Sequence, residues 1–296
     1  MRVATVKIQV LSPSDYPDYA GMTFPFYRQQ LLIPLGSSPL IGVGAEHAEQ
    51  PIGFALASVE GDTAELLSVY VEKSHRGKKI SVQLMTKLIE ELSRRGIRSI
   101  RTSYMDGLPG AEAFQALLTG TGWQEPQPSM LFFHYMAEKM ANTPWMRPFR
   151  TPPHCELFHL REMRQADQEQ YESLTRASNF PSSLDYTKQP YPVSWANSFG
   201  LRRDGTLIGW MATHLLGDHT IRYTSLVVQE QYQAKGYALP LIFQAIQTHC
   251  KELLHIPHAI QGIPLAFPSM VRLARNKLQP YADREELSWE ARRTLV

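Results

Sequence analysis

The sequence predicts an α/β (α+β) protein built from two copies of one mixed fold. Three observations support this prediction: β-rich runs alternate with helical patterns, segments of the first half recur in the second half, and the length suits two domains. The 296 residues of the chain are enough for two domains of about 150 residues each. Its 43% hydrophobic and 20% charged residues are typical of a globular protein.

Three segments recur in the same order and at a nearly constant distance along the chain. The offset is 156 residues for the first segment and 157 for the other two, which indicates a duplication. The matching pairs are 52–57 with 208–213, 66–71 with 223–228, and 75–81 with 232–238.

The boundary between the copies is marked by composition. Residues 138–155 carry four prolines and no hydrophobic periodicity, which suits an irregular connection. We therefore predict two domains, 1–140 and 156–296, joined by a proline-rich linker at 141–155.

Each copy has the pattern of a β-hairpin that leads into a crossover helix. The predicted elements of the first copy are strands at 52–59 and 65–71, a helix that begins near Val82 and ends near Gly96, and a strand at 97–103. Those of the second copy are strands at 207–214 and 221–228, a helix with Leu241, Ile242, Ala245 and Ile246 on one face, and a strand near 259–263.

The junction between the strand 223–228 and the following helix is the most informative feature. Gly236 and Ala238 are small, so the backbone at the start of the helix can approach a ligand closely. Free N–H groups and the positive end of the helix dipole favour a bound anion, above all a pyrophosphate. Lys235 adds a positive charge nearby.

This junction resembles the coenzyme A signature of the GNAT superfamily of N-acyltransferases, Gln/Arg-x-x-Gly-x-Gly/Ala after a β-strand. The second copy matches through Gln233, Gly236 and Ala238, whereas the first matches at Arg76 but has Lys79 and Ser81 at the small positions. The first copy also carries Ala113-Phe114 and Gly122-Trp123, similar to the late helix of the family. The resemblance implies two tandem GNAT folds, each with a mixed, mostly antiparallel central sheet flanked by helices.

The resemblance also implies the cofactor, acetyl-CoA or another acyl-CoA, and no metal. In the family the loop holds the pyrophosphate and the preceding strand splays to bind the pantetheine arm. The residues expected to bind coenzyme A in the first copy are Val69, Tyr70, Val71, Arg76, Gly77, Lys78, Lys79, Ile80 and Ser81. Those in the second copy are Leu226, Val227, Val228, Gln233, Ala234, Lys235, Gly236, Tyr237 and Ala238.

Acylation of an amine needs a group that accepts a proton at neutral pH. Many GNAT enzymes place a glutamate eleven residues ahead of the loop's first Gln or Arg, and that position is Glu65 here, which could also simply begin an exposed strand. The second copy has Arg222 there, and an arginine cannot serve as a base at neutral pH. Tyr104 is the candidate general acid, with His134 or Tyr135 as substitutes, although each of them could be a packing residue.

Aromatic residues mark the segments that border the acceptor site in this family. They could line a pocket for a peptide or an acyl chain, or belong to the core. The segments are Tyr16, Tyr19, Phe24, Phe26 and Tyr27 in the first copy, and 179–195 in the second.

The expected activity is acyl transfer from acyl-CoA to an amine on a small molecule or peptide, such as a lysine-type side chain. The alternative is a catalytically inactive acyl-CoA-binding or regulatory protein, suggested by Lys79, Ser81 and Arg222. A nucleotide-binding protein of another type is a weaker reading, because neither a P-loop nor a Gly-x-Gly-x-x-Gly after a strand is present.

Charge and termini exclude other classes. The 30 basic and 28 acidic residues nearly balance, so we expect no nucleic-acid partner and no membrane insertion. Two distant cysteines, without a CxxC pattern, argue against a disulfide framework or metal site. Without a signal peptide or an apolar run of about 18–20 residues, a cytoplasmic location is expected.

Overall fold

The computed structural model describes residues 5–32, 40–144, 151–189 and 191–295. The chain divides into two compact units, one of Met1–Ser129 with Leu287–Val296 (unit 1) and one of Met130–Glu286 (unit 2). These units do not follow the predicted ranges 1–140 and 156–296 at every point, because each takes one strand from the other copy's sequence. Part of the predicted linker, 145–150, lies outside the described residues.

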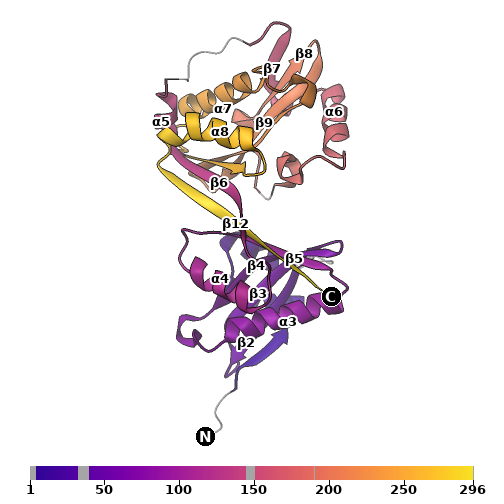
Figure 1. Cartoon of the computed structure of the whole chain (residues 1–296), viewed down its shortest axis with the longest axis vertical. Helices are drawn as coiled ribbons and strands as arrows, with labels where there is room; N and C mark the ends of the chain where they lie inside the picture. The colour runs from indigo at the N-terminus through magenta and orange to yellow at the C-terminus, as the bar shows by residue number, and fades with distance from the viewer. Residues whose placement is uncertain (1–4, 33–39, 145–150, 190, 296) are drawn as a thin grey trace. The chain divides into compact units, whose positions relative to one another are not determined.

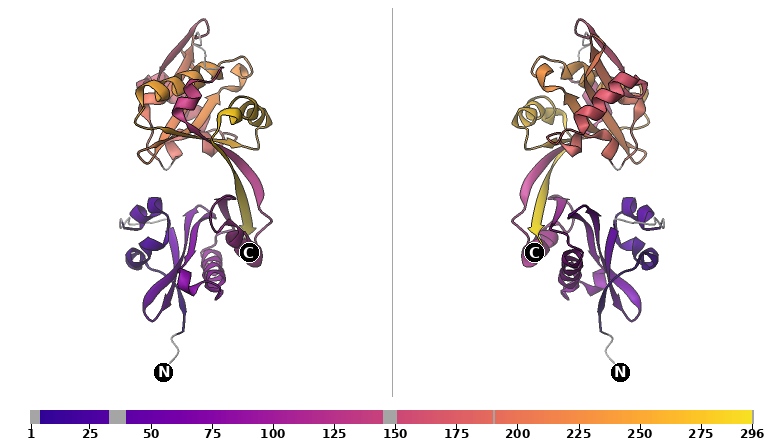
Figure 2. Two further views of the ribbon diagram at one scale, coloured as in Figure 1. Left: turned by 90° about the vertical axis from the view of Figure 1, so that its left-hand side faces the viewer. Right: turned by 90° about the vertical axis from the view of Figure 1, so that its right-hand side faces the viewer.

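Unit 1 is a six-stranded sheet with helices on both faces. Its order is β1-β2-β3-β4-β5-β12, and neighbours are antiparallel except β4 and β5. Figure 2 shows α3 and α4 on one face of this sheet and α1 and α2 on the other. The strands are β1 (Lys7–Val10), β2 (Leu40–His47), β3 (Gln50–Glu60), β4 (Thr63–Val71), β5 (Ser99–Met105) and β12 (Arg284–Thr294), and the helices are α1 (Tyr16–Tyr19), α2 (Pro25–Leu32), α3 (Ile80–Arg94) and α4 (Ala111–Gly120).

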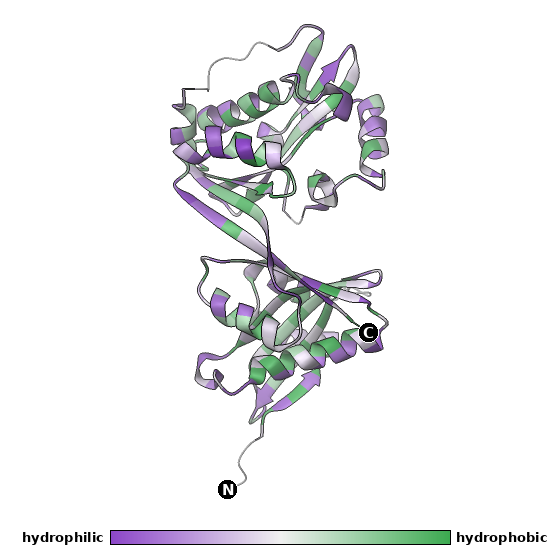
Figure 3. Cartoon of the chain, viewed as in Figure 1, coloured by the Kyte–Doolittle hydropathy of each residue, from purple (hydrophilic) through white to green (hydrophobic). Residues whose placement is uncertain are grey.

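Helix α3 confirms the helix predicted from periodicity. Its apolar positions recur every three or four residues and pack on the sheet, whereas polar residues face outward. Green and purple positions alternate along it in Figure 3, as expected for an amphipathic helix. The side chains that this helix buries in the core of unit 1 are Ile80, Leu84, Met85, Leu88, Ile89 and Leu92.

Glu91 is a buried acid on the same helix and predicts acid sensitivity of unit 1. Hydrogen bonds from Arg94, and then from Arg95, outweigh burial and lower the pKa of Glu91 from 4.5 to about 2. Because the folded-state pKa is depressed, the stabilisation is complete above about pH 4.5 and is lost as the pH falls toward about 2. Glu91→Gln should therefore lower the free energy of unfolding by about 1 kcal/mol near neutral pH, since both arginines are largely in solvent.

Urea unfolding at neutral pH and at about pH 2 checks this prediction, with the two free energies compared at each pH. The difference between Glu91→Gln and wild type should vanish at the lower pH. Glu90→Gln is the control, because Glu90 is exposed and only loosely paired with Lys87. An equal difference at both pH values would show that the charge of Glu91 is not responsible.

Unit 2 repeats the arrangement of unit 1. Its sheet has the order β6-β11-β10-β9-β8-β7, antiparallel except for β10 and β11. Helices α7 and α8 lie on one side of the sheet and α6 on the other (Figure 1). The strands are β6 (Gln127–Met136), β7 (Cys155–His159), β8 (Phe199–Arg203), β9 (Thr206–Leu216), β10 (Thr220–Val228) and β11 (His258–Pro264), and the helices are α5 (Ala137–Ala141), α6 (Gln165–Thr175), α7 (Ala238–Glu252) and α8 (Pro268–Lys277).

The last strand of each sheet is exchanged between the copies. In unit 1, β12 from the chain's C-terminal end pairs with β5 from Ser288 opposite Met105 to Thr294 opposite Ser99. In unit 2, β6, which follows the first copy's α4, pairs with β11 from Met130 opposite Pro264 onward. Each unit is therefore completed by residues distant in sequence.

The change of repeat offset from 156 to 157 has a simple structural cause. Two residues, 61 and 62, connect β3 to β4, whereas three, 217–219, connect β9 to β10. The extra residue lies in the hairpin turn, so the strands and the loops after them keep their equivalence.

Candidate active site

The loops after β4 and β10 have the same backbone conformation. Each begins with a short 3-10 turn, η3 (Lys73–His75) or η8 (Glu230–Tyr232), followed by an extended residue. That residue is Arg76 in unit 1, with φ −67° and ψ 160°, and Gln233 in unit 2, with φ −66° and ψ 160°. α3 and α7 then start four or five residues later.

The first residue of the signature anchors each loop to the strand before it. Arg76 Nε donates to the carbonyl of Val71 at 2.9 Å, and Gln233 Nε2 donates to the carbonyl of Val228 at the same distance. Arginine and glutamine are interchangeable here because either can donate one N–H to a strand-end carbonyl. This anchoring role is visible only in the structure.

Both loops have left-handed backbone at the same two positions. The glycine is at the first of these positions in unit 1 and at the second in unit 2. Unit 1 has Gly77 (φ 77°) and then Lys79 (φ 60°), whereas unit 2 has Ala234 (φ 58°) and then Gly236 (φ 85°). Lys79, which departs from the signature in sequence, therefore keeps the loop's shape. Each loop bears one strained residue without the freedom of glycine.

Lys79→Gly should stabilise unit 1 by about 1 kcal/mol, because glycine relieves the left-handed strain at this position. Lys78→Gly is the matched control: Lys78 has no positive φ, so glycine there should destabilise by up to about 1 kcal/mol through unfolded-chain entropy. Urea unfolding monitored by circular dichroism measures both values. A loss of stability in Lys79→Gly would contradict the strain at this position.

The loops present N–H groups to an anion. The first turn of α3 or α7 has backbone N–H groups without an intrahelical acceptor, and the positive end of the helix dipole lies there. The loop before α3 contains three basic residues, Arg76, Lys78 and Lys79. In the loop of unit 2, Lys235 Nζ donates to the carbonyl of Gln231 at 2.7 Å. Both loops fit a pyrophosphate group.

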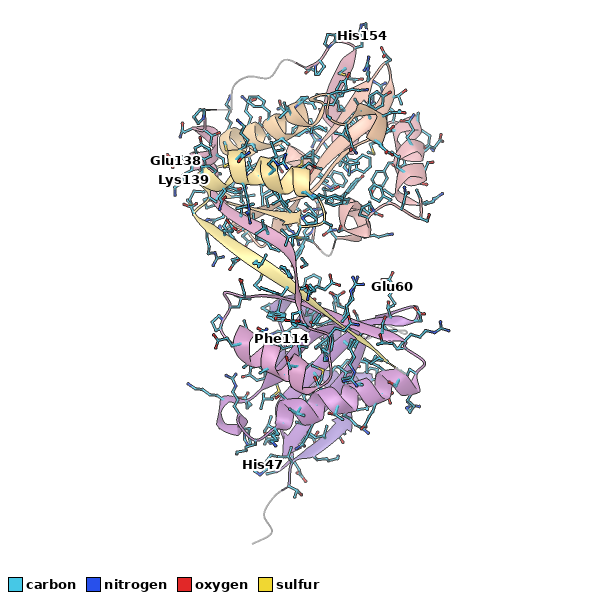
Figure 4. The ribbon with its side chains drawn as sticks, in the orientation of Figure 1. His47, Glu60, Phe114, Glu138, Lys139 and His154 are labelled. Atoms are coloured by element: carbon cyan, nitrogen blue, oxygen red, sulfur yellow. The ribbon has the colours of Figure 1, made fainter. Side chains whose placement is uncertain are left out.

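The last residue of a neighbouring strand borders each loop. It is His47 of β2 in unit 1 and Arg203 of β8 in unit 2. The ring of His47, at the end of β2 (Figure 4), lies 5.4 Å from the ring of His75. In unit 2 the guanidinium of Arg203 lies 5.9 Å from the Tyr232 ring and donates to the Tyr237 hydroxyl at 2.5 Å. The equivalent surroundings differ in chemistry although the loops share a backbone.

The strand before each loop carries a β-bulge at the equivalent place. In unit 1 Leu67 is the extra residue, because Leu66 and Ser68 pair with neighbouring residues of β3. In unit 2 Thr224 is the extra residue of β10. A bulge takes its extra residue out of the ladder, so a backbone N–H becomes available there to polarise a carbonyl.

Beside the bulges, the parallel strands part. Within the described residues, the pairs of β4 and β5 end with Glu65 opposite Arg101, although β4 continues to Val71. The pairs of β10 and β11 end with Tyr223 opposite Gln261, although β10 continues to Val228. The strand residues expected to bind coenzyme A, 69–71 and 226–228, lie in these ends, which pair with β3 or β9 on one side only.

Glu65 is placed where β4 and β5 stop pairing. Its side chain is 42% exposed, and Arg101 Nη2 lies 3.4 Å from Oε2. Ala64 and Leu66, the neighbours of Glu65 on β4, are buried in the core beneath α3. Because strand side chains alternate, the Glu65 carboxylate lies on the opposite face, toward α1 and α2.

Tyr104 lies on the other face of the sheet from Glu65. It packs on the core under α3 and α4, with its ring 5.4 Å from that of Phe114 on α4 (Figure 4). Burial, with a smaller effect of Asp106, raises the pKa of Tyr104 above 10. The hydroxyl therefore stays protonated at neutral pH, but the structure does not bring it onto the same face as Glu65.

The substitutes for Tyr104 belong to the other unit. His134 and Tyr135 lie on β6 within unit 2, where His134 Nε2 is 2.6 Å from Glu286 Oε2. The hydroxyl of Tyr135 is buried and has no hydrogen-bond partner among the described residues. Neither lies in the unit that contains Glu65.

Arg222 occupies the equivalent of the Glu65 position in unit 2. Its guanidinium lies 5.8 Å from the ring of Phe132 on β6. Burial lowers the pKa of Arg222 from its usual value, but an arginine remains protonated at neutral pH. The two copies therefore differ in charge at the same point of the fold.

The aromatic residues expected to border the acceptor site of the first copy differ in burial. Tyr16 and Tyr19 are buried in a core with Phe54, as the packing alternative predicts. Phe24 is 58% exposed. In unit 2 the segment 179–195 instead contributes to a cavity, described below.

Among the described residues, no group of three or more histidine, cysteine or acidic side chains could hold a metal ion. None of the helices in the described ranges is both long and apolar enough to cross a membrane.

Comparison with known proteins gives a family and a fold. The acetyltransferase (GNAT) family model matches residues 8–114 and 160–261, one match in each copy. Among solved structures, the chain is similar to a tandem GNAT protein from the clavulanic acid biosynthesis pathway, with 11% identity, a TM-score of 0.69 and coverage of 99% of both chains. It is also similar to a GCN5-related N-acetyltransferase from Sphaerobacter thermophilus, with 13% identity, a TM-score of 0.65, and coverage of 98% of this chain and 96% of that one.

These likenesses confirm the predicted fold, two tandem GNAT folds with mixed sheets. No curated protein matches the sequence.

Proposed function

Because the chain belongs to the acetyltransferase (GNAT) family, we propose that it is an N-acyltransferase that transfers an acetyl or longer acyl group from acyl-CoA to an amine. The acceptor is an amine on a small molecule or a peptide. One observation carries the proposal: in unit 1 the anion-binding loop, the bulge and the Glu65 carboxylate follow one another along β4 and its end.

The loop residues Arg76–Ser81 bind the pyrophosphate of acyl-CoA through backbone N–H groups and nearby positive charge. Acyl-CoA supplies the activated thioester. The end of β4 offers backbone groups to the pantetheine arm on the side that no longer pairs with β5. The N–H at the bulge polarises the thioester carbonyl. Apart from the nearby positive charge, the protein's contributions come from the backbone, so Lys79 and Ser81 are compatible with them.

Glu65 accepts the proton of the attacking amine. The Glu65 carboxylate is 42% exposed at the point where the two strands part, and Arg101 Nη2 lies 3.4 Å from it. The thiol is a good leaving group, so the absence of Tyr104 from this face does not prevent the reaction.

Unit 2 has a complete loop but a cation, Arg222, at the position of the base. We assign it a supporting role, in which it binds acyl-CoA or another ligand without catalysing transfer. If Glu65 does not act as a base, the chain is instead an acyl-CoA-binding or regulatory protein, and the cation in unit 2 favours that alternative.

Glu65→Gln should lower kcat/KM for acyl transfer by about 100-fold or more, since it removes the proton acceptor. Arg101→Gln is the matched control: it breaks the same ion pair but leaves the carboxylate, and an exposed pair contributes about 0–1 kcal/mol. It should keep activity within about threefold of wild type. Release of free thiol from acetyl-CoA with a panel of amines measures both, and equal losses in the two variants would assign Glu65 an orienting role only.

A further inference from the structure

Unit 2 contains a cavity of about 430 Å³ on the α6 side of its sheet. It lies between the 3-10 turn η4 (Leu160–Glu162), the start of α6 and the segment from η6 (Tyr186–Lys188) to η7 (Trp195–Asn197). Its size falls in the range of small-molecule sites, about 300–1,000 Å³. Neither the loop of Gln233 nor the strand end 226–228 belongs to its lining.

Aromatic rings form one wall of this cavity. Tyr186, Tyr191 and Trp195 all line it, and the rings of Tyr186 and Trp195 meet edge to face with centroids 6.5 Å apart. Tyr186 is buried and packs on Tyr171 at 4.9 Å, so the deeper part of the wall is held by the core. Trp195 is 44% exposed and stands at the rim.

A buried histidine fixes the position of this wall. His214 Nε2 lies 3.0 Å from the carbonyl of Tyr186, which can only accept, so Nε2 carries the proton. Burial lowers the pKa of His214, and the neutral ring then accepts at Nδ1 from the Thr224 hydroxyl at 2.9 Å. The cavity is thereby tied to the bulge of β10 and is preformed.

One charged side chain lines the cavity among the described residues, and it is a cation. Arg161 contacts Glu162 only at 3.8 Å, and both are more than half exposed, so its guanidinium remains available to a ligand. The nearby acid Asp185 accepts hydrogen bonds from Tyr171 at 2.5 Å and Thr187 at 2.6 Å inside the unit, and it is not part of the lining. A guanidinium beside aromatic rings suits a planar carboxylate attached to an apolar body.

We propose that this cavity binds a small carboxylic acid with an aromatic body. Arg161 pairs with the carboxylate, the side-chain amides of Gln168 and Gln189 supply further hydrogen bonds, and the ring stacks among Tyr186, Tyr191 and Trp195. The site needs no acyl transfer and no acyl-CoA to be occupied, so it stands apart from the proposed reaction.

Binding of 3-phenylpropanoate to the full chain, without acyl-CoA, tests the proposal by isothermal titration calorimetry and Trp fluorescence. Saturable binding is expected, and 3-phenylpropanamide and 2-phenylethylamine should each bind at least about tenfold more weakly because they lack the carboxylate. Arg161→Gln should weaken binding of the acid by about tenfold, whereas Arg176→Gln, on an exposed arginine paired with Glu172 outside the cavity, should not.

Trp195→Phe shows whether the fluorescence change comes from this cavity or from another tryptophan. The substitution should remove the fluorescence change, whereas binding measured by calorimetry should persist. Tighter binding of the amine than of the acid, an unchanged affinity in Arg161→Gln, or no saturable heat with the acid would each overturn the proposal. Because no turnover is measured, failure here leaves the acyltransferase proposal unaffected, and failure of acyl transfer leaves this one unaffected.

Discussion

Deletion of residues 287–296 is expected to unfold unit 1. The deletion removes the part of β12 that pairs with β5, Ser288–Thr294. It also removes Ala291 and Leu295 from the core of that unit. Its backbone also joins the rest of unit 1, because Gln124 donates to the carbonyl of Arg292 at 2.9 Å. Loss of a complete strand should cost about 5 kcal/mol or more, which is comparable to the total stability of a domain.

Limited proteolysis followed by mass spectrometry locates the effect of this deletion, with cleavage expected within 40–129 and protection retained in unit 2. A synthetic peptide of residues 284–296 should restore protection by refilling the vacated strand position. Ala291→Asp, which places a charge at a buried position, should mimic the deletion in the full-length chain, whereas the neighbouring exposed Arg292→Asp should not. An unchanged protease pattern after deletion would contradict the strand exchange.

A negative charge at the start of α3 should abolish the anion site of unit 1 without harming the helix. Ser81→Asp adds an acid to the first turn, where it interacts favourably with the helix dipole but repels a pyrophosphate. We expect coenzyme A binding to unit 1 to weaken by about 10–100-fold and kcat/KM to fall in parallel. Ser81→Asn, of similar size and no charge, is the control.

The equivalent substitution in unit 2 is Ala238→Asp, 157 residues further along. It should remove coenzyme A binding at that loop but keep kcat/KM within about threefold, because Arg222 stands where a base is needed. Calorimetry with coenzyme A and the thiol-release assay measure both variants. Loss of turnover in Ala238→Asp alone would move catalysis to unit 2.

The sequence predicted those features that depend on local pattern. The duplication follows from the recurring segments, helix α3 from hydrophobic periodicity, and the loop of unit 2 from small residues at a strand–helix junction. The loop of unit 1 is less readable in the sequence, because nothing in a lysine indicates the left-handed backbone that Lys79 adopts. Two glycines indicate indirectly that Lys79 needs a left-handed backbone. Gly236 occupies the position equivalent to Lys79 in unit 2, and Gly77 lies two residues before Lys79.

The strand exchange and the bulges could not be predicted in the same way. Periodicity tells which side of a strand is buried, but not which sheet the strand joins. From the sequence, β6 is therefore assigned to the first copy and β12 to the second, whereas each completes the sheet of the other unit. A bulge at Leu67 or Thr224 changes pairing by one residue without altering composition. Likewise, the aromatics Tyr16 and Tyr19 are core residues whereas Tyr186 lines a cavity, and alternation alone does not separate these cases.

Glu65 and Tyr104 lie on opposite faces of the same sheet. Glu65 lies where the pairing of β4 and β5 ends, on the face opposite the core beneath α3. Tyr104 is held in the opposite layer by Phe114, so a dedicated general acid is not part of the proposed mechanism. Both copies have the GNAT fold. The proposed roles, catalysis in unit 1 and support in unit 2, depend on one position, which is Glu65 in unit 1 and Arg222 in unit 2.

Amine-dependent release of thiol from acetyl-CoA, with mass-spectrometric detection of the acylated amine, tests the central claim most directly. We expect thiol release that rises with amine concentration and saturates, with an equimolar amount of N-acylated product, and we expect Glu65→Gln to abolish it. Tight coenzyme A binding with neither thiol nor acylated product, across a panel of amines and peptides and several acyl chain lengths, would contradict it.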